Sequence, residues 1–252
     1  MKNHTTKPKL RTPVAHPPTL VAQPERTPPV PFHFCAASYL TRIHNQTAKD
    51  LSELLAGIDQ VPDASIFCHT FQTLGEHHFL TEGFSNDFAQ WTLASLNRPV
   101  LAEWLGGIDV RDYISLAEIR ADLRRVVAGY CDSWPQHAHI AAGEAFHFSE
   151  SIEVTVPLGL EAFSLAEFRD CFAALSNSSL YYHLIFSRLR LQMRTNDFSE
   201  WLAGCLGLDD LARRVNRLDI YTDTLDGIRE KMLQWIDREL KGRDWIGRET
   251  RA

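Results

Sequence analysis

The sequence of 252 residues predicts a mainly α-helical fold. We expect two tandem helical repeats of about five helices each, related by a pseudo-two-fold axis and preceded by a disordered N-terminal arm. Three observations predict this fold: an internal duplication, apolar residues at helical spacing in both copies, and prolines gathered before the first copy.

The first element is an N-terminal arm over residues 1–31. It holds eight of the twelve prolines, which remove backbone donors, and it shows little apolar periodicity, so we expect an extended, disordered segment. Five Lys and Arg against one Glu give the arm a charge of +4, and because the whole chain carries −6 the remainder carries −10. An acidic body is a poor receptor for polyanions, which argues against nucleic acid as a partner.

The body contains two copies of one pattern, at residues 32–131 and 146–242. A linker at 132–145 joins them, and a polar tail follows at 243–252. Three motifs return in order, separated by small gaps: FHF at 32–34 and 146–148, SIFCH at 65–69 and SLYYH at 179–183, NDFAQW at 86–91 and NDFSEW at 196–201. Matches in a fixed order are the mark of an internal duplication.

Each copy has the pattern of a series of helices. Apolar residues recur at i, i+3, i+4 and i+7, beginning at Leu51 in the first copy. Residues that favour helix starts precede such runs at corresponding positions, namely Ser65 and Ser179, Asn86 and Asn196. The segment ESIEVTVP at 150–157 instead alternates β-branched residues, which predicts a short strand or an extended strap.

The motifs together give the chain a family resemblance. They are PFHF at 31–34, SIFCHT at 65–70, HHFL at 77–80, NDFAQW at 86–91, SLYYH at 179–183 and TNDFSEWL at 195–202. In this order they resemble an uncharacterised family of bacterial and archaeal proteins, a domain of unknown function. The resemblance implies the duplicated fold, and it brings no activity, cofactor or catalytic residue.

The repeated letters place one histidine and one aspartate in each copy, His69 with Asp87 and His183 with Asp197. Each aspartate follows an Asn cap, where the helix dipole favours a carboxylate and where it can accept a hydrogen bond from a buried imidazole. Such a pair would join two helices without any catalysis. We favour this structural interpretation, because ionisable pairs are often structural.

The alternative is a metal-dependent enzyme of hydrolase type, in which His69, Asp87, His183 and Asp197 meet at one divalent transition metal. Two imidazoles and two carboxylates suit zinc, manganese or iron. Neither histidine is followed at i+4 by a second ligand, the usual spacing on a helix. We therefore favour no cofactor and no metal.

Two further groups of residues suggest binding but have simpler interpretations. Trp91 and Trp201 come three residues after a phenylalanine, a helical spacing that places them in the core. The basic run with Arg188, Arg190 and Arg194 is expected to be a solvated helix face. Binding of a phosphate or an acidic partner is the alternative for this run.

Composition completes the functional expectations. Five cysteines without a CxxC pair indicate reduced thiols and a cytoplasmic protein. No apolar run approaches the roughly 20 residues that cross a bilayer, so no membrane partner is expected. Because no complete catalytic constellation is present, we expect a non-catalytic interaction or regulatory module with an unknown protein partner. The metal-dependent enzyme is the alternative, and weak nucleic-acid binding is the third hypothesis.

Overall fold

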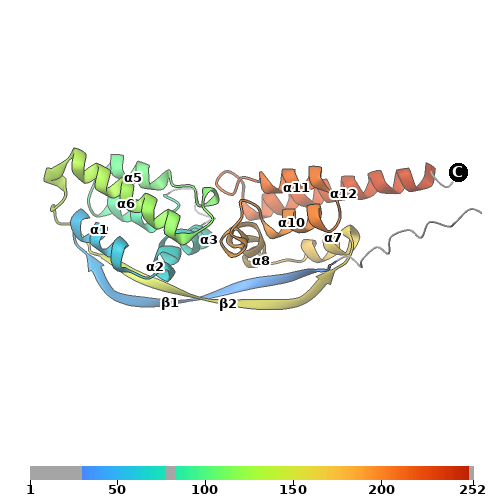
Figure 1. The fold of residues 1–252 in the computed structure, drawn as a ribbon, viewed down its shortest axis with the longest axis horizontal. Coiled ribbons are helices and arrows are strands. Elements are labelled where there is room, and N and C mark those ends of the chain that lie inside the picture. The colour runs from blue at the N-terminus through green and yellow to red at the C-terminus, as the bar shows by residue number, and fades with distance from the viewer. Residues whose placement is uncertain (1–29, 78–82, 250–252) are drawn as a thin grey trace, which may run out of the picture.

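The fold is a long two-stranded β-ribbon with helices packed along one side of it (Figure 1). The computed structural model describes residues 30–77 and 83–249. Strands β1 (Phe32–Ala48) and β2 (Phe146–Ala162) have 17 residues each and pair antiparallel. The prediction of a mainly α-helical fold is therefore wrong, and the fold is mixed α/β.

The strands were hard to recognise because neither has one environment along its length. In β2, residues 146–151 are mostly buried, whereas residues 152–161 are all exposed. A strand of this kind lacks the single alternation of apolar and polar residues that marks a half-buried strand. The alternation at 150–157 does lie in a strand, but it covers only part of β2.

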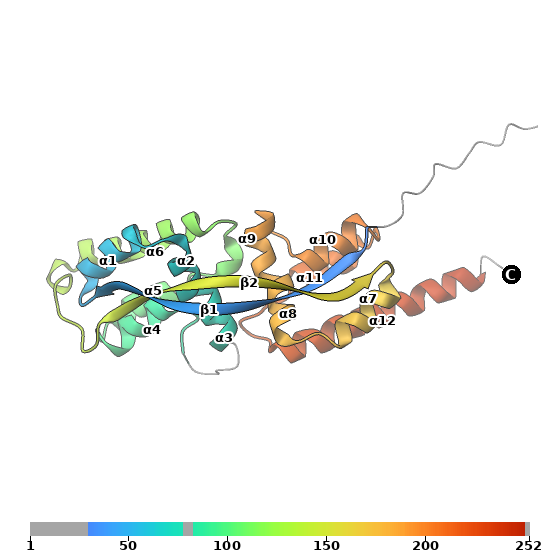
Figure 2. The same ribbon diagram turned by 90° about the horizontal axis from the view of Figure 1, so that it is seen from below.

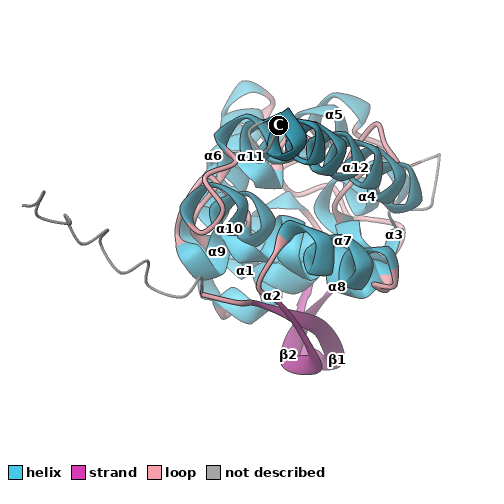
Figure 3. Ribbon diagram, turned by 90° about the vertical axis from the view of Figure 1, so that its right-hand side faces the viewer, coloured by secondary structure: helices cyan, strands magenta, loops and turns pink. Residues whose placement is uncertain are grey.

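The helices form two groups, which we call lobe 1 and lobe 2. Lobe 1 contains α1 (Leu51–Gln60), α2 (Asp63–Phe67), the π-helical turn η1 (Cys68–Gln72), α3 (Thr73–His77), α4 (Asp87–Ala94), α5 (Pro99–Gly106), the 3₁₀ turn η2 (Val110–Asp112), α6 (Leu116–Ser133) and the 3₁₀ turn η3 (Pro135–His137). Lobe 2 contains α7 (Leu165–Ala173), α8 (Asn177–Tyr181), the π-helical turn η4 (Tyr182–Phe186), α9 (Ser187–Leu191), α10 (Asp197–Gly204), α11 (Asp209–Asn216) and α12 (Leu225–Glu249). The end view shows the helices of both lobes on the same side of the ribbon (Figure 3).

Parts of three predicted segments lie outside the described residues. These are residues 1–29 of the N-terminal arm, residues 78–80 of the HHFL motif and residues 250–252 of the polar tail. The rest of the predicted tail, residues 243–249, continues α12.

The middle of the ribbon brings corresponding residues of the two predicted copies together. Tyr39 of β1 lies opposite Glu153 of β2, and these residues also correspond under the sequence offset of 114. A two-fold axis that passes through an antiparallel pair places corresponding residues opposite each other in this way. The predicted pseudo-two-fold axis would therefore pass between these two side chains.

Each strand begins in the lobe of the other copy. In lobe 2, Phe168 contacts both phenylalanine rings of the FHF motif at 32–34. In lobe 1, Phe88 contacts both rings of the FHF motif at 146–148. Each strand then crosses beneath both lobes and enters the first helix of its own copy, as Figure 2 shows. The FHF motifs are thus the points at which the two copies exchange strands.

Candidate functional site

The duplicated histidines hold the ribbon to the helices. In lobe 1, His69 is buried in η1, and its Nδ1 lies 2.7 Å from Oδ2 of Asp87 at the start of α4. Its Nε2 accepts a hydrogen bond from the N–H of Ser149 in β2 at 2.9 Å. One imidazole therefore links two helical segments of lobe 1 to the strand that arrives from the other copy.

Lobe 2 repeats this arrangement. His183 is buried in η4, its Nδ1 lies 2.7 Å from Oδ2 of Asp197, and its Nε2 accepts from the N–H of Cys35 in β1 at 2.9 Å. Because Nε2 is the acceptor in both lobes, the imidazole proton lies on Nδ1 and is donated to the aspartate. Both ring nitrogens are in use, so metal binding would first have to break one of these hydrogen bonds.

The structure arranges the four candidate ligands as two separate pairs. The two backbone groups that the histidines bind are Cys35 on β1 and Ser149, which pairs with Ile43 of β1. Positions 35 and 43 are eight residues apart, about 26 Å at the rise of a strand. Among residues 30–77 and 83–249, no group of three or more His, Cys, Asp and Glu side chains is placed to hold a metal ion. The candidate four-ligand cluster is therefore not brought together.

The asparagines of the repeated motif begin the next helices. Asn86 accepts from the N–H of Ala89 and caps α4, and Asn196 accepts from the N–H of Ser199 and caps α10. Both asparagines have the extended backbone of an N-cap residue. The helix starts predicted at these two positions are confirmed.

The tryptophans of the same motif fasten the incoming strand. The indole N–H of Trp91 donates to the carbonyl of Glu144 at 2.7 Å, and that of Trp201 donates to the carbonyl of Val30 at 2.8 Å. Residues 30 and 144 correspond under the offset of 114, and each lies two positions before its strand. Both indoles are buried, so each serves as a packed ring and as an anchor for the strand of the other copy.

The two serines of the repeated motif do not begin helices. The cap positions are Pro62 for α2 and Ser176 for α8, so the caps predicted at Ser65 and Ser179 are wrong. Both serines are fully buried in the first turns, and the hydroxyl of Ser179 donates to the carbonyl of Cys35 in β1. This part of lobe 2 thus contacts the strand through a hydroxyl as well as through an imidazole.

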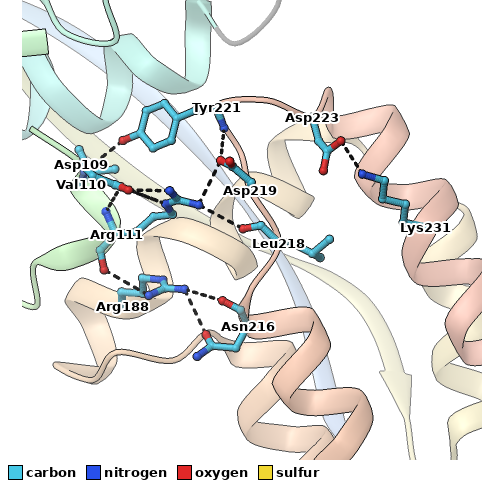
Figure 4. Close-up of polar contacts among 10 residues, drawn as sticks. All are labelled: Asp109, Val110, Arg111, Arg188, Asn216, Leu218, Asp219, Tyr221, Asp223 and Lys231. Carbon is cyan, nitrogen blue, oxygen red and sulfur yellow. Dashed lines mark hydrogen bonds and ion pairs between the residues drawn. The ribbon is translucent and has the colours of Figure 1, made fainter. Parts of the chain in front are cut away.

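A polar joint connects the two lobes (Figure 4). The guanidinium of Arg111 in η2 binds the carboxylate of Asp109 at 2.6 Å and reaches Asp219 of lobe 2 at 3.1 Å. It also lies 5.0 Å from the ring centroid of Tyr221, whose hydroxyl accepts from the N–H of Val110. Because Asp109 and Asp219 occupy corresponding positions, one arginine bridges two equivalent carboxylates across the interface.

The environment of the joint keeps its groups ionised. The hydrogen bond to Asp109 raises the pKa of Arg111 above its ordinary value. Burial acts to raise the pKa of Asp219, but hydrogen bonds from the N–H of Tyr221 and from Thr222, together with Arg111, outweigh it and lower this pKa. The joint is therefore an ion-paired contact at neutral pH.

Arg188 belongs to the same joint (Figure 4). It is only 6% exposed, and its guanidinium donates to the carbonyl of Arg111 and to Oδ1 of Asn216. Burial lowers the pKa of Arg188. The prediction of a solvated face is therefore wrong for this residue, whereas about half of the Arg190 side chain is exposed.

A cavity of about 450 Å³ lies where the lobes and the ribbon meet. Aromatic and aliphatic side chains from both lobes line it, among them Phe67, Leu116 and Phe186. Glu153 from β2 and Arg190 from α9 add opposite charges. Pockets at interfaces between lobes are common places for small ligands, and this volume is within their usual range.

The repeated motifs predict neither the joint nor the cavity. Arg111 corresponds to Tyr221 in the second copy, and Glu153 corresponds to Tyr39 in the first. The joint and the cavity depend on residues that differ between the copies. A comparison of the copies picks out only the residues that they share. The match of Asp109 with Asp219 was the available signal for the joint.

Comparison with known proteins identifies the family. A model for a family of unknown function, DUF5752, matches residues 29–237. The chain belongs to this family. A solved structure, OrfY from Thermoproteus tenax, is similar to this DUF5752 chain, with 30% sequence identity and a TM-score of 0.71. The similarity covers 83% of this chain and 95% of that chain, and no curated protein matches the sequence.

No described helix of this DUF5752 protein is both long and apolar enough to cross a membrane. The family description assigns no function.

Proposed function

We propose that this protein is a non-catalytic interaction module of the cytoplasm, and that its β-ribbon pairs with the ribbon of a second copy of the chain. The observation that carries the proposal is the exposed half of β2. Every residue from Ile152 to Glu161 is exposed, and apolar side chains alternate along it.

The alternation places an apolar stripe on one face of the ribbon. Ile152, Val154 and Val156 share one face of β2, and Leu40, opposite Ile152 on β1, extends the stripe at 61% exposure. Contiguous exposed apolar surface marks interaction sites in proteins. An exposed, β-branched strand with a free edge also favours pairing with another strand.

A second copy is a suitable occupant because the strand is complementary to itself. An antiparallel pair of two β2 strands centred on Val154 would place Ile152 opposite Val156 of the other copy. The same register would place Glu153 opposite Thr155, so that no like charges face each other. A two-fold symmetric interface of this type is the commonest arrangement of homodimers.

Other features support a protein without catalysis. Both ring nitrogens of His69 and of His183 are taken by a carboxylate and a backbone N–H. Burial raises the pKa of the thiols of Cys35, Cys131 and Cys171, which keeps them protonated and weakly nucleophilic. The five cysteines form no disulfide, which fits the reducing cytoplasm.

The test is the effect of Val154→Arg on the oligomeric state, measured by light scattering after size-exclusion chromatography. We expect the unmodified chain to be a dimer and the variant a monomer, because the pairing register would bring two arginines together. Val100→Arg on α5 is the matched control, since Val100 is 47% exposed and Val154 46%. A monomeric unmodified chain, or equal dissociation by the two substitutions, would contradict the proposal.

A further inference from the structure

The large cavity between the lobes has an apolar interior. Phe67 and Phe186 are at most 8% exposed, and their ring centroids lie 5.0 Å apart. Leu116 and Leu189 complete this interior from α6 and α9. The cavity therefore offers a place to the apolar body of a small molecule, whose transfer from water would be the main source of affinity.

A buried polar group also lines the cavity. Ser151 of β2 is 8% exposed, and its hydroxyl has no hydrogen-bond partner among the described residues. A buried hydroxyl without a partner is unfavourable, and native proteins satisfy nearly all such groups. A ligand in the cavity would supply the missing partner.

Two opposite charges lie at the more exposed part of the lining. Glu153 is exposed on β2, and Arg190 is held over the ring of Tyr182, 5.1 Å from its centroid, by an ion pair with Asp197. In the described contacts Arg190 uses only Nη2 for hydrogen bonding, so other N–H donors of its fork remain for a carboxylate. Glu153 is suited to bind an ammonium group.

A smaller cavity, lined by residues of both copies at corresponding positions, lacks this chemistry. Its volume is about 190 Å³, and Tyr39, Gln72 and Gly75 stand where the larger cavity has Glu153, Phe186 and Leu189. The two copies have thus diverged at these positions, and the larger volume coincides with the lining that has both charges.

We propose that the larger cavity binds a small zwitterion with an apolar body, the chemistry of a free hydrophobic amino acid. Phe67, Phe186 and the two leucines would enclose the side chain. Glu153 would bind the ammonium group and Arg190 the carboxylate. This site does not use the apolar stripe of the proposed dimer contact, because Glu153 alternates with the stripe and points to the other face of β2.

The test is calorimetric titration of the full chain with L-leucine and L-phenylalanine. Three probes separate the contributions: isopentylamine lacks the carboxylate of leucine, 4-methylpentanoate lacks its ammonium group, and glycine lacks its apolar side chain. We expect both amino acids to bind, and each probe to bind about tenfold or more weakly, the loss expected for one charge-assisted hydrogen bond or for the apolar contact.

Variants of the lining assign the two charges. Glu153→Gln should weaken leucine binding about tenfold and leave the affinity for 4-methylpentanoate unchanged. Arg190→Gln should also weaken leucine binding about tenfold, and it should leave the affinity for isopentylamine unchanged. Ala64→Leu, which fills the cavity, should abolish binding of all probes. Arg125→Gln on α6 is the charge control, because its ion pair with Asp122 lies outside the cavity lining.

The outcomes are separable even if one variant folds poorly. Arg190→Gln removes an ion pair and has to be checked by thermal unfolding, whereas Glu153→Gln breaks no described ion pair. No binding of either amino acid to the unmodified chain would overturn the proposal. If Glu153→Gln and Ala64→Leu both bound leucine as tightly as the unmodified chain, the proposal would be overturned as well, since the ligand would then lie elsewhere.

Discussion

At the scale of single residues, the two buried histidines have a more demanding role than joining two helices. A neutral imidazole has one donor and one acceptor on opposite sides of its ring, and His69 uses them for Asp87 and for the N–H of Ser149. The sequence predicted the partner on Nδ1, because the aspartate recurs beside the histidine in both copies. It could not predict the partner on Nε2, since the strand that supplies it comes from the other copy.

The first prediction concerns the hydrogen bond between His69 and the strand. His69→Ala would leave the carboxylate of Asp87 and the N–H of Ser149 without the imidazole, and it would open a void beside Phe88 and Phe146. We expect the free energy of unfolding to fall by about 2–4 kcal/mol, the range for a lost buried hydrogen-bond network with a cavity. Urea unfolding followed by circular dichroism measures this change.

Two further variants make the measurement specific. His183→Ala should lower the stability by a similar amount, because it removes the same contacts in lobe 2. His139→Ala is the control, since the His139 side chain is 78% exposed, and it should change the stability by less than about 0.5 kcal/mol. A loss of that small size in His69→Ala would show that the imidazole does not hold the strand.

At the scale of elements, the sequence predicted helices well and strands poorly. Asn86 and Asn196 begin helices as expected, because a cap residue and the apolar period after it are both local signals. The helix starts predicted at Ser65 and Ser179 are wrong, because the cap of each helix is an earlier residue. The strands could not be found by period, because each is half covered by a distant lobe and half exposed.

The fit of a strand against a helix leads to the second prediction. Gly57 lies inside α1, where alanine would ordinarily stabilise a helix by about 1 kcal/mol. A Cβ at this position would overlap the ring of Phe148 at the start of β2. We expect Gly57→Ala to destabilise the protein by about 1–3 kcal/mol through overpacking, as measured by thermal unfolding.

Gly129 offers a matched control in α6. A Cβ there meets no atom of the described residues within 4 Å, so Gly129→Ala should raise the stability by about 0.5–1 kcal/mol. Opposite signs for the same substitution in two helices would identify the contact with Phe148 as the cause. If Gly57→Ala also stabilised the protein, the close packing of α1 against β2 would be refuted.

At the scale of the whole molecule, the two predicted copies and the two lobes are not the same units. The sequence divides the body into copies at 32–131 and 146–242, whereas each lobe is completed by the first residues of the strand from the other copy. An exchange of this kind cannot be predicted from one sequence by period or by capping. It depends on which of two similar hydrophobic pockets receives each FHF motif, and both pockets present a histidine, a phenylalanine and a tryptophan to its first ring.

The exchange means that neither copy can bury its own core. A chain ending at residue 138 keeps lobe 1 but loses the rings of Phe146 and Phe148 and the N–H that His69 binds. A chain starting at residue 139 keeps lobe 2 but loses the FHF motif at 32–34. We therefore expect each fragment alone to lack a cooperative thermal transition, because an open aromatic core removes several kcal/mol from a margin of about 5–15 kcal/mol.

Mixing the two fragments should restore the fold. Each would supply the strand that the other lacks, and the ribbon would form between chains as it does within one, so the mixture should elute as a single complex with a cooperative transition. If Phe146 and Phe148 are replaced by serine in the fragment that starts at residue 139, mixing should not restore the fold, because the core of lobe 1 would remain open. A cooperative transition in either fragment alone would show that a copy folds with its own strand, and that the exchange is not required for the core.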